Sequence, residues 1–197
     1  MSSLSSSSGV KIGNEAWHAV YTKHQHEKVV AERLTRQGFE TFLPLSTMVH
    51  QWRDRTKRLS LPLFPGYVFV RGAFGRRLEV LKDPSVHAIV EKAGHPEVIP
   101  EHEIAAIRRA VESSLQIEPH PFSDDGDCAR IKSGPLAGLE GILIRQQDQL
   151  RLVLSVETLG QSVAVEVGPY QVELINGLEA KRIRARVGYR SAALSPV

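Results

Sequence analysis

The sequence predicts an α+β fold, in which an N-terminal α/β sandwich with an antiparallel sheet is followed by a small all-β barrel. Residues 17–114 mix segments of alternating hydrophobicity with amphipathic helical segments. Residues 126–176 carry only short alternating segments separated by turn residues. Between them, residues 115–125 lose periodicity and collect Pro, Asp and Ser, which is typical of an interdomain linker. The predicted organisation is a Ser-rich disordered leader (1–14), an N-terminal domain (15–114), a linker (115–125), a barrel (126–176) and a basic tail (177–197).

The N-terminal domain is predicted to have the order β-α-β-β-β-α-β-α. Val30 and Leu34 lie four residues apart on one face of the first helix, and Gly38 ends that helix. Ile104, Ile107 and Val111 form the inward face of the last helix. The expected elements are a strand at 17–22, a helix at 27–37, a strand at 39–45, a basic hairpin at 48–63, a strand at 67–71, a short helix at 73–82, a strand at 86–90 and a helix at 101–114.

The C-terminal half shows no helical pattern. Its short strands are expected at residues 127–132, 140–145, 150–156, 164–167 and 172–175. Five short strands in about 50 residues are typical of a small antiparallel barrel.

Charge is distributed unevenly along a chain whose formal net charge is only +3. Residues 22–77 contain 11 Lys and Arg against 4 Asp and Glu, whereas residues 78–175 contain 8 against 16. The tail is basic again. A basic first third suits a nucleic-acid backbone, because Lys and Arg contacts to phosphates release counterions whatever the base sequence. A solvated basic face with no nucleic acid is the alternative interpretation.

Neither a membrane span nor a secretory signal is expected from the sequence. No uninterrupted apolar run approaches the roughly 20 residues of a transmembrane helix. The Ser-rich start lacks the apolar core of a secretory signal, and one cysteine cannot form an internal disulfide. These features favour a cytoplasmic protein.

We find no set of residues in the sequence with the spacing of a catalytic or metal-binding motif. His24 and His26 lack a third ligand at suitable spacing, and the metalloprotease helix pattern that begins at His102 has Ala106 where its second histidine belongs. Cys128, between apolar neighbours, is interpreted as a small buried thiol. The run GPLAGLEG lacks the Gly-Lys-Ser/Thr of a phosphate-binding loop and is interpreted as a turn. We therefore expect no enzyme activity, no cofactor and no metal.

Two segments together resemble a known family. LFPGYVFV at residues 63–70 is similar to the signature of the NusG N-terminal (NGN) domain. DCARIKSGPLAGLEGILI at residues 127–144 resembles a KOW motif, with Gly141 at the characteristic glycine and Gly138 in the same turn. The resemblance covers roughly residues 17–175. It implies an NGN-type sandwich and an SH3-like KOW barrel in a monomeric transcription elongation factor, which modulates pausing, termination and antitermination without catalysing a reaction.

The resemblance also implies where partners bind. An apolar depression of the N-terminal domain would dock on the clamp helices of the largest RNA polymerase subunit. The residues at matching positions are Trp17, Tyr21, Phe64, Pro65 and Tyr67. Trp17 could equally be a core residue, and Phe64, before a Pro-Gly turn, is the favoured interface residue.

Basic residues of the same domain are candidates for nucleic-acid binding. Lys23, His24 and Arg33 match a basic edge that contacts non-template DNA in specialised relatives similar to RfaH. The predicted hairpin adds a basic tip with Arg53, Arg55, Lys57 and Arg58.

In housekeeping members the barrel recruits Rho or a small-subunit ribosomal protein through a loop whose matching residues here are Leu159 and Gln161. Leu159 stands where those members carry an aromatic residue, and Gln161 follows Gly160 where they often carry Arg, which argues against either partner. The segment LSVETLGQSVAVEV is more similar to specialised antiterminator paralogues. The alternative function is a KOW-containing RNA-binding or ribosome-associated protein, which the basic tail would suit.

Overall fold

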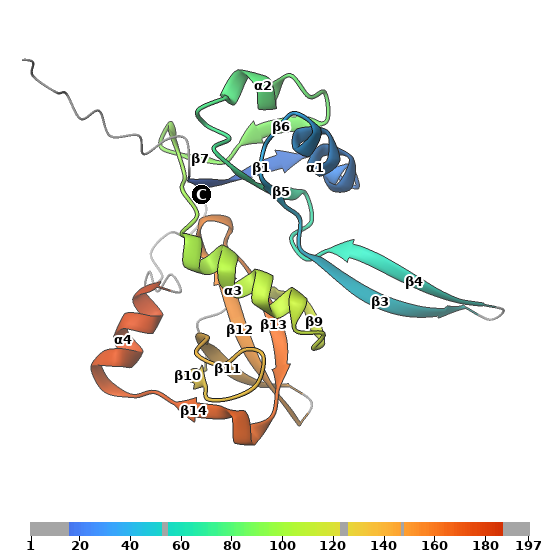
Figure 1. Cartoon of the computed structure of the whole chain (residues 1–197). Helices are drawn as coiled ribbons and strands as arrows, with labels where there is room; N and C mark the ends of the chain where they lie inside the picture. Colours follow the sequence, from blue (N-terminus) through green and yellow to red (C-terminus); the bar gives the residue numbers. More distant parts are fainter. Residues whose placement is uncertain (1–15, 53–54, 123–125, 147, 187–197) are drawn as a thin grey trace, which may run out of the picture.

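The computed structural model describes residues 16–52, 55–122, 126–146 and 148–186, with backbone alone for residues 48–52, 55–58 and 186. Figure 1 shows two bodies, each built on an antiparallel sheet, with one long helix between them and a two-stranded ribbon that projects from the first body. The predicted α+β class is confirmed. The leader at residues 1–14 lies outside the described residues.

The first body is a sheet with the strand order β2-β5-β1-β6. Its strands are β1 (Trp17–Thr22), β2 (Thr41–Phe42), β5 (Tyr67–Arg71) and β6 (Val86–Ile89). Strand β1 pairs antiparallel with β5 and with β6. Helices α1 (Glu27–Arg36) and α2 (Arg77–Leu81) cover one face, and α3 (Glu101–Glu112) lies against the other. The result is the predicted sandwich.

Side chains alternate along each strand, so the two faces of the sheet carry different residues. Val20, Val68 and Val70 point to α1, where they meet Val30 and Leu34 in an aliphatic cluster. Their neighbours in the sequence point the other way and join a second cluster, whose members from this sheet are Trp17, Ala19, Phe42, Tyr67 and Phe69. This second cluster continues through α3 into the C-terminal body. One core therefore connects the two bodies.

Several elements of the first body differ from their predicted bounds. The strand predicted at 39–45 is reduced to β2, because Pro44 lacks an N–H for the ladder and the chain turns into the hairpin. That hairpin, β3 (Leu45–Trp52) with β4 (Arg55–Pro62), forms a separate two-stranded sheet. Its base is attached to α1 through the Lys28 ammonium, which donates to the Ser60 carbonyl at 2.6 Å. Two short strands, β7 (Glu91–Lys92) and β8 (His95–Pro96), were not predicted.

The second body is a curled sheet with the order β14-β10-β11-β12-β13-β9. Its strands are β9 (Ile117–Pro121), β10 (Asp127–Ile131), β11 (Glu140–Gln146), β12 (Gln149–Val156), β13 (Gln161–Val167) and β14 (Val172–Leu174), with the short turns η1 (Glu157–Leu159) and η2 (Pro169–Gln171). The sequence predicted five of these strands.

Two segments of the second half correct the sequence analysis. The predicted linker contains β9, which pairs with β13 from Ile117↔Val165 to Gln161↔Pro121. Its prolines lowered the strand signal, but an edge strand tolerates proline because one side of its backbone needs no partner. The predicted tail contains α4 (Gly177–Arg186), whose Ile183 is buried against Cys128, Ile142 and Val153. The expectation of no helix after residue 114 is therefore wrong.

Candidate partner-binding surfaces around helix α3

The exposed edge of the aromatic face lies where β1 meets the turn before β5. Tyr21 is 45% exposed, and its ring lies 5.4 Å from that of half-buried Tyr67 and 5.2 Å from that of His87. Pro65, in the turn, is also exposed. Burial raises the pKa of Tyr67, and the neighbouring Tyr21 hydroxyl adds to the effect. We call Tyr21, Pro65 and Tyr67 the tyrosine rim.

The turn that presents this rim is held firmly by backbone contacts. Gly66 adopts φ +85°, and a Cβ there would meet the Tyr21 ring at 3.3 Å. The Gly66 N–H donates to the buried Glu27 carboxylate at 2.7 Å, and the Gly66 carbonyl accepts from the Thr22 N–H at 2.8 Å. Helix α1 and strand β1 thus fix the turn, so Pro65 and Tyr67 are held in place before any partner arrives.

The other two predicted docking residues are part of the core. Trp17 and Phe64 are each 1% exposed. The Phe64 ring packs edge-on against Phe69 at 5.4 Å, and both residues belong to the cluster shared with α3 and the barrel. For Trp17 this matches the core alternative. For Phe64 the favoured surface position is not observed, because the Pro-Gly turn exposes Pro65 and directs Phe64 inward.

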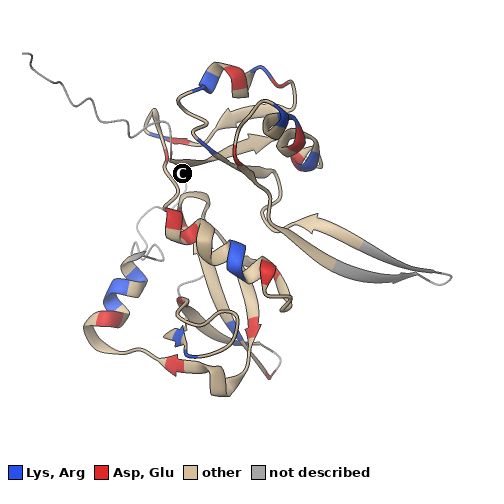
Figure 2. Ribbon diagram, in the orientation of Figure 1, with Lys and Arg blue, Asp and Glu red and all other residues tan. Residues whose placement is uncertain are grey.

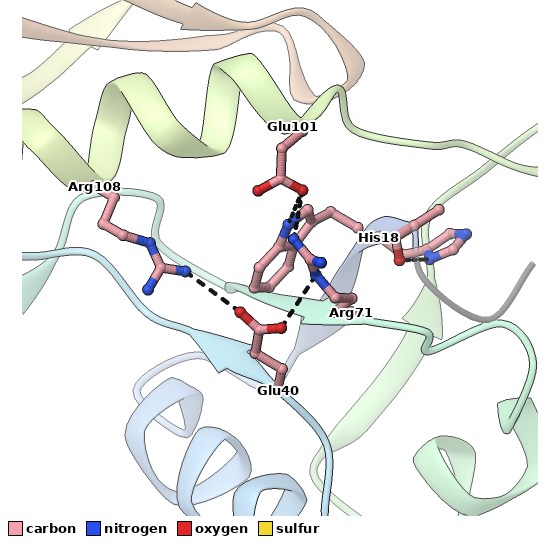
Figure 3. A network of polar contacts seen from close by, with 7 residues as sticks. His18, Glu40, Arg71, Glu101 and Arg108 are labelled. Carbon is pink, nitrogen blue, oxygen red and sulfur yellow. Dashed lines mark hydrogen bonds and ion pairs between the residues drawn. The ribbon is translucent and has the colours of Figure 1, made fainter.

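A polar network locks α3 over Trp17 (Figure 3). The Trp17 indole N–H donates to the Glu101 carboxylate at 3.0 Å, and the Arg71 guanidinium, 5.0 Å above the indole ring, bonds the same carboxylate oxygen at 2.5 Å. Arg71 also pairs with Glu40 at 3.1 Å, and Arg108 reaches Glu40 at 3.8 Å. This network could not be predicted from local patterns. Glu101 and Arg108 lie on the helix predicted at 101–114, but their partners come from elsewhere in the sequence: Arg71 ends β5 and Glu40 precedes β2.

The opposite side of α3 meets the barrel with fewer polar contacts. Arg109 donates to the carbonyls of Pro135 at 3.0 Å and Ala137 at 2.8 Å. Glu103 is buried, and its Oε2 has no hydrogen-bond partner. Burial raises the pKa of Glu103 to about 7, and the charge of Glu157 in η1 adds to the shift. The α3–barrel contact therefore contains a carboxyl group that is poorly accommodated when ionised.

The residues predicted to bind nucleic acid lie in two parts of the first body. Lys23 and His24 are exposed in the turn between β1 and α1. Arg33 is half-exposed but pairs with the buried Asp83 at 3.2 Å, which also accepts from the Ser85 N–H, so Arg33 has a structural partner already. Arg53 lies outside the described residues. Arg55, Lys57 and Arg58 belong to β4, whose ribbon extends away from both bodies (Figure 1).

In the barrel, Leu159 and Gln161 flank Gly160 at the end of η1. Leu159 is half-buried and packs against the shared core, and Gln161 pairs with Val156 and Pro121 in the sheet. Gly138 lies in a turn with φ +83°, where its N–H donates to the Ile131 carbonyl. Gly141 is not a turn residue: it lies in β11, where a Cβ would meet the Val153 carbonyl at 2.5 Å. Close approach of β12 therefore requires this glycine.

Chemistry beyond binding has little support in the part of the chain that the structure describes. Within it, no group of three or more His, Cys, Asp or Glu side chains could hold a metal ion. Burial raises the pKa of the Cys128 thiol, which makes it a poor nucleophile. No helix in the described ranges is long and apolar enough to cross a membrane.

The described chain thus consists mainly of two sheet-based bodies joined by one helix, with an exposed aromatic rim on the first. Comparisons with known proteins find relatives over most of its length. The family model described as transcription termination factor nusG matches residues 15–108. The transcription termination/antitermination protein NusG of Staphylococcus carnosus is 26% identical over 181 residues, covering 83% of this chain and 97% of that protein. The protein of the same name from Helicobacter pylori is 25% identical over 172 residues, covering 81% and 98%. Residues 15–108 thus match the nusG family model, and both relatives of that name are similar to the chain over more than four fifths of its length.

A solved structure agrees on the fold. The structure described as domain interaction in Thermotoga maritima NusG matches with a TM-score of 0.53 at 22% identity, covering 82% of this chain and 98% of that one.

Proposed function

We propose that this protein is a transcription termination/antitermination factor that binds RNA polymerase through the tyrosine rim of its first body. Similarity to the NusG family supports the process, since the curated relatives carry that name. The observation that carries the docking site is the exposed pair Tyr21 and Tyr67 on a turn fixed by Gly66 and Glu27. Aromatic residues anchor interfaces because they bury a large area at low entropic cost.

The partner we propose for this rim is the pair of clamp helices of the largest polymerase subunit. Trp17 and Phe64 lie behind the rim and hold its strands in place instead of providing free surface. A partner that contacted the Trp17 ring directly would have to displace α3, which covers it through Glu101. Docking on the exposed rim needs no such displacement.

The output of docking would be a shift in polymerase conformation. A factor that binds one clamp state more tightly changes pausing and termination through its binding energy alone, so no catalytic group is needed. We propose that it acts as a monomer in the cytoplasm. Residues 15–114 would form the polymerase-binding unit, and residues 126–176, together with β9 from the predicted linker, the KOW barrel.

Contacts to nucleic acid would come from the same body. Lys23 and His24 are exposed beside the rim, and the ribbon of β3 and β4 extends outward with Arg55, Lys57 and Arg58 in one strand. We propose that this basic edge contacts the non-template DNA strand. Arg33 contributes less, because Asp83 already neutralises it.

Recruitment of Rho or a small-subunit ribosomal protein is less well supported. Leu159 is half-buried against the shared core, and Gln161 is a paired strand residue. A loop with so little free apolar surface makes a poor anchor for a protein partner. We propose a specialised paralogue that works mainly through its first body.

The test is transcription in vitro by the cognate RNA polymerase, with Tyr21→Ala/Tyr67→Ala compared with the wild type. Phe64 is unsuitable, because its truncation would open a cavity in the core. Tyr170→Ala is the matched control, since Tyr170 is 92% exposed on the barrel. We expect the wild type and the control to alter pausing or read-through and the rim variant to lose most of the effect. An unchanged effect in the folded rim variant would refute the docking site.

A further inference from the structure

We infer that the outer face of helix α4 is a binding surface for single-stranded RNA. The helix belongs to the predicted basic tail, to which the proposed function assigns no role. Figure 1 shows it on the far side of the barrel from the β3–β4 ribbon, and Figure 2 shows its basic residues. The surface is therefore separate from both the tyrosine rim and the ribbon.

The inner face of α4 is fixed on the barrel sheet. Ile183 is 2% exposed in a small core with Cys128, Ile142, Val153 and Ala164, and Ala180 packs beside it. The Cys128 thiol lies 3.4 Å from the Ala180 carbonyl. These side chains belong to the sheet face opposite the shared core, because alternation sends Ala129, Leu152 and Val163 to the other side. Helix α4 thus covers a face that would otherwise expose apolar groups.

Polar contacts then set the rotation of the helix. Arg130 of β10 bonds Glu140 at 2.7 Å and also pairs with Glu179, so the acidic residue of α4 is already neutralised. These two carboxylates raise the pKa of Arg130 above its usual value. Arg184 donates to the Gly126 carbonyl at 2.6 Å. With these contacts made, one particular face of α4 must point to solvent.

That face carries Leu178, Lys181, Arg182 and Ala185, which recur at helical spacing and are all exposed. Glu179, the acidic residue of the helix, turns towards Arg130 and does not compensate the two cations. Preorganised cations on a packed helix lose less entropy on binding an anion than cations on a free tail. Phosphates are the anions that such a sequence-independent basic face fits best.

The geometry selects a single strand over a duplex. An α-helix with its side chains is about 10–12 Å across, close to the roughly 12 Å width of the major groove. Leu178, the large apolar residue of this face, gains a partner where bases are unstacked, whereas the bases of a duplex are already stacked on one another. A flexible strand can instead lie across the exposed face, with its phosphates near Lys181 and Arg182 and a base against Leu178.

The choice of RNA rests on the proposed function, because the transcript is the single strand that a transcribing polymerase releases. Membrane binding fits less well, since the apolar side of α4 is used against the barrel and Leu178 is the large apolar residue left outside. An acidic protein surface is the other negatively charged partner to consider. The experiment distinguishes it from RNA, because a face that binds only acidic proteins would give no RNA binding.

The test measures fluorescence anisotropy of a labelled single-stranded RNA with the full chain and no polymerase. The variant is Lys181→Ala/Arg182→Ala. The control, Lys92→Ala/Lys132→Ala, removes two exposed lysines from β7 and from the end of β10. Each phosphate contact on a single strand contributes roughly 0.7 to the slope of log affinity against log salt. We therefore expect the variant to lose about 1.4 in slope and about tenfold in affinity near 0.15 M salt.

The control should bind RNA like the wild type, and a duplex DNA of equal length should bind more weakly than RNA. Equal RNA affinity of the variant and the control, no RNA binding by the wild type, or tighter binding of the duplex would each overturn the proposal. The readout contains no polymerase, so failure here and failure of the tyrosine rim are separate results. Alanine favours helix formation and both sites are exposed, so the variant keeps its fold, which circular dichroism checks.

Discussion

The two faces of the N-terminal sheet are built from neighbouring residues yet differ in kind. The face under α1 is closed and aliphatic except for Phe39, with Val20, Leu34 and Val68 all at 0% exposure. The face under α3 is aromatic, is bridged by charged groups and remains open at Tyr21 and Tyr67. The first can only stabilise the fold. The second combines rigid support with exposed aromatic area, which is what a docking surface needs.

The largest expected effect is a loss of stability when a residue of the closed face is truncated. Leu34→Ala should lower the free energy of unfolding by about 2–5 kcal/mol, because it leaves a cavity in the closed aliphatic layer. Polymerase binding should be unchanged at temperatures where the variant is folded. Denaturant titration gives the stability, and Val29→Ala, at a 41% exposed position of the same helix, should stay within about 0.5 kcal/mol of wild type. A Leu34 variant as stable as that control would show that this layer is not closed.

The next largest effect is the pH dependence of stability that Glu103 causes at the contact between α3 and the barrel. The folded-state pKa of Glu103 is raised from 4.5 to about 7, so its contribution to stability is fully present below pH 4.5 and is lost as the pH rises through 7. Glu103→Gln should therefore be more stable than wild type at pH 8, by on the order of 2–3 kcal/mol, and nearly equal to it at pH 4.5.

The quantity to measure is the difference in the free energy of unfolding between wild type and Glu103→Gln at each pH. His18 is present in both proteins, and its contribution to stability depends on pH in the opposite direction. Burial lowers the pKa of His18, so its contribution is lost as the pH falls. Exposed Glu112→Gln, on the same helix, serves as the control. A Glu103→Gln difference that does not vary with pH would mean that the carboxyl is solvated at this contact.

A smaller effect tests the polar lock on the sheet side of α3. Trp17→Phe keeps the aromatic packing and removes the hydrogen bond to Glu101, which should cost about 1–2 kcal/mol. A double-mutant cycle with Glu101→Ala, which removes the acceptor, measures the coupling. Additive effects of the two changes would show that the indole N–H and the carboxylate do not interact.

The smallest effect belongs to the edge of this network. Arg108 contacts Glu40 at 3.8 Å and lies 4.7 Å from the Phe42 ring, in a partly exposed setting. Arg108→Ala should cost about 0.5 kcal/mol, and less in high salt. Thermal unfolding measures the change. A loss of more than about 2 kcal/mol in the free energy of unfolding would show that the Arg108–Glu40 pair stabilises the fold more than a partly exposed ion pair is expected to.

The sequence predicted the closed face better than the open one. Val30 and Leu34 were identified as buried from helical periodicity, because burial follows spacing directly. The motif around Pro65 located the rim, but the inward position of Phe64 depends on how the Gly66 turn bonds to Glu27, some 40 residues away. Long-range contacts of this kind leave no local pattern.

The two missed elements have a related cause. Strand β9 contains prolines that mask its alternation, and α4 has only Ala180 and Ile183 as apolar residues on its inner face, so both depend on the barrel for their stability. The spacing of Ala180 and Ile183, among residues that favour helix formation, was the local sign that the basic tail could form a helix.

The most direct test of the docking claim is hydrogen exchange of the full chain with and without a fragment of the polymerase clamp helices. Slower exchange in peptides spanning residues 17–23 and 64–71, with α1 and the barrel strands unchanged, is the predicted result. Protection confined to the barrel, or none at saturating fragment, would contradict it and place the polymerase contact elsewhere.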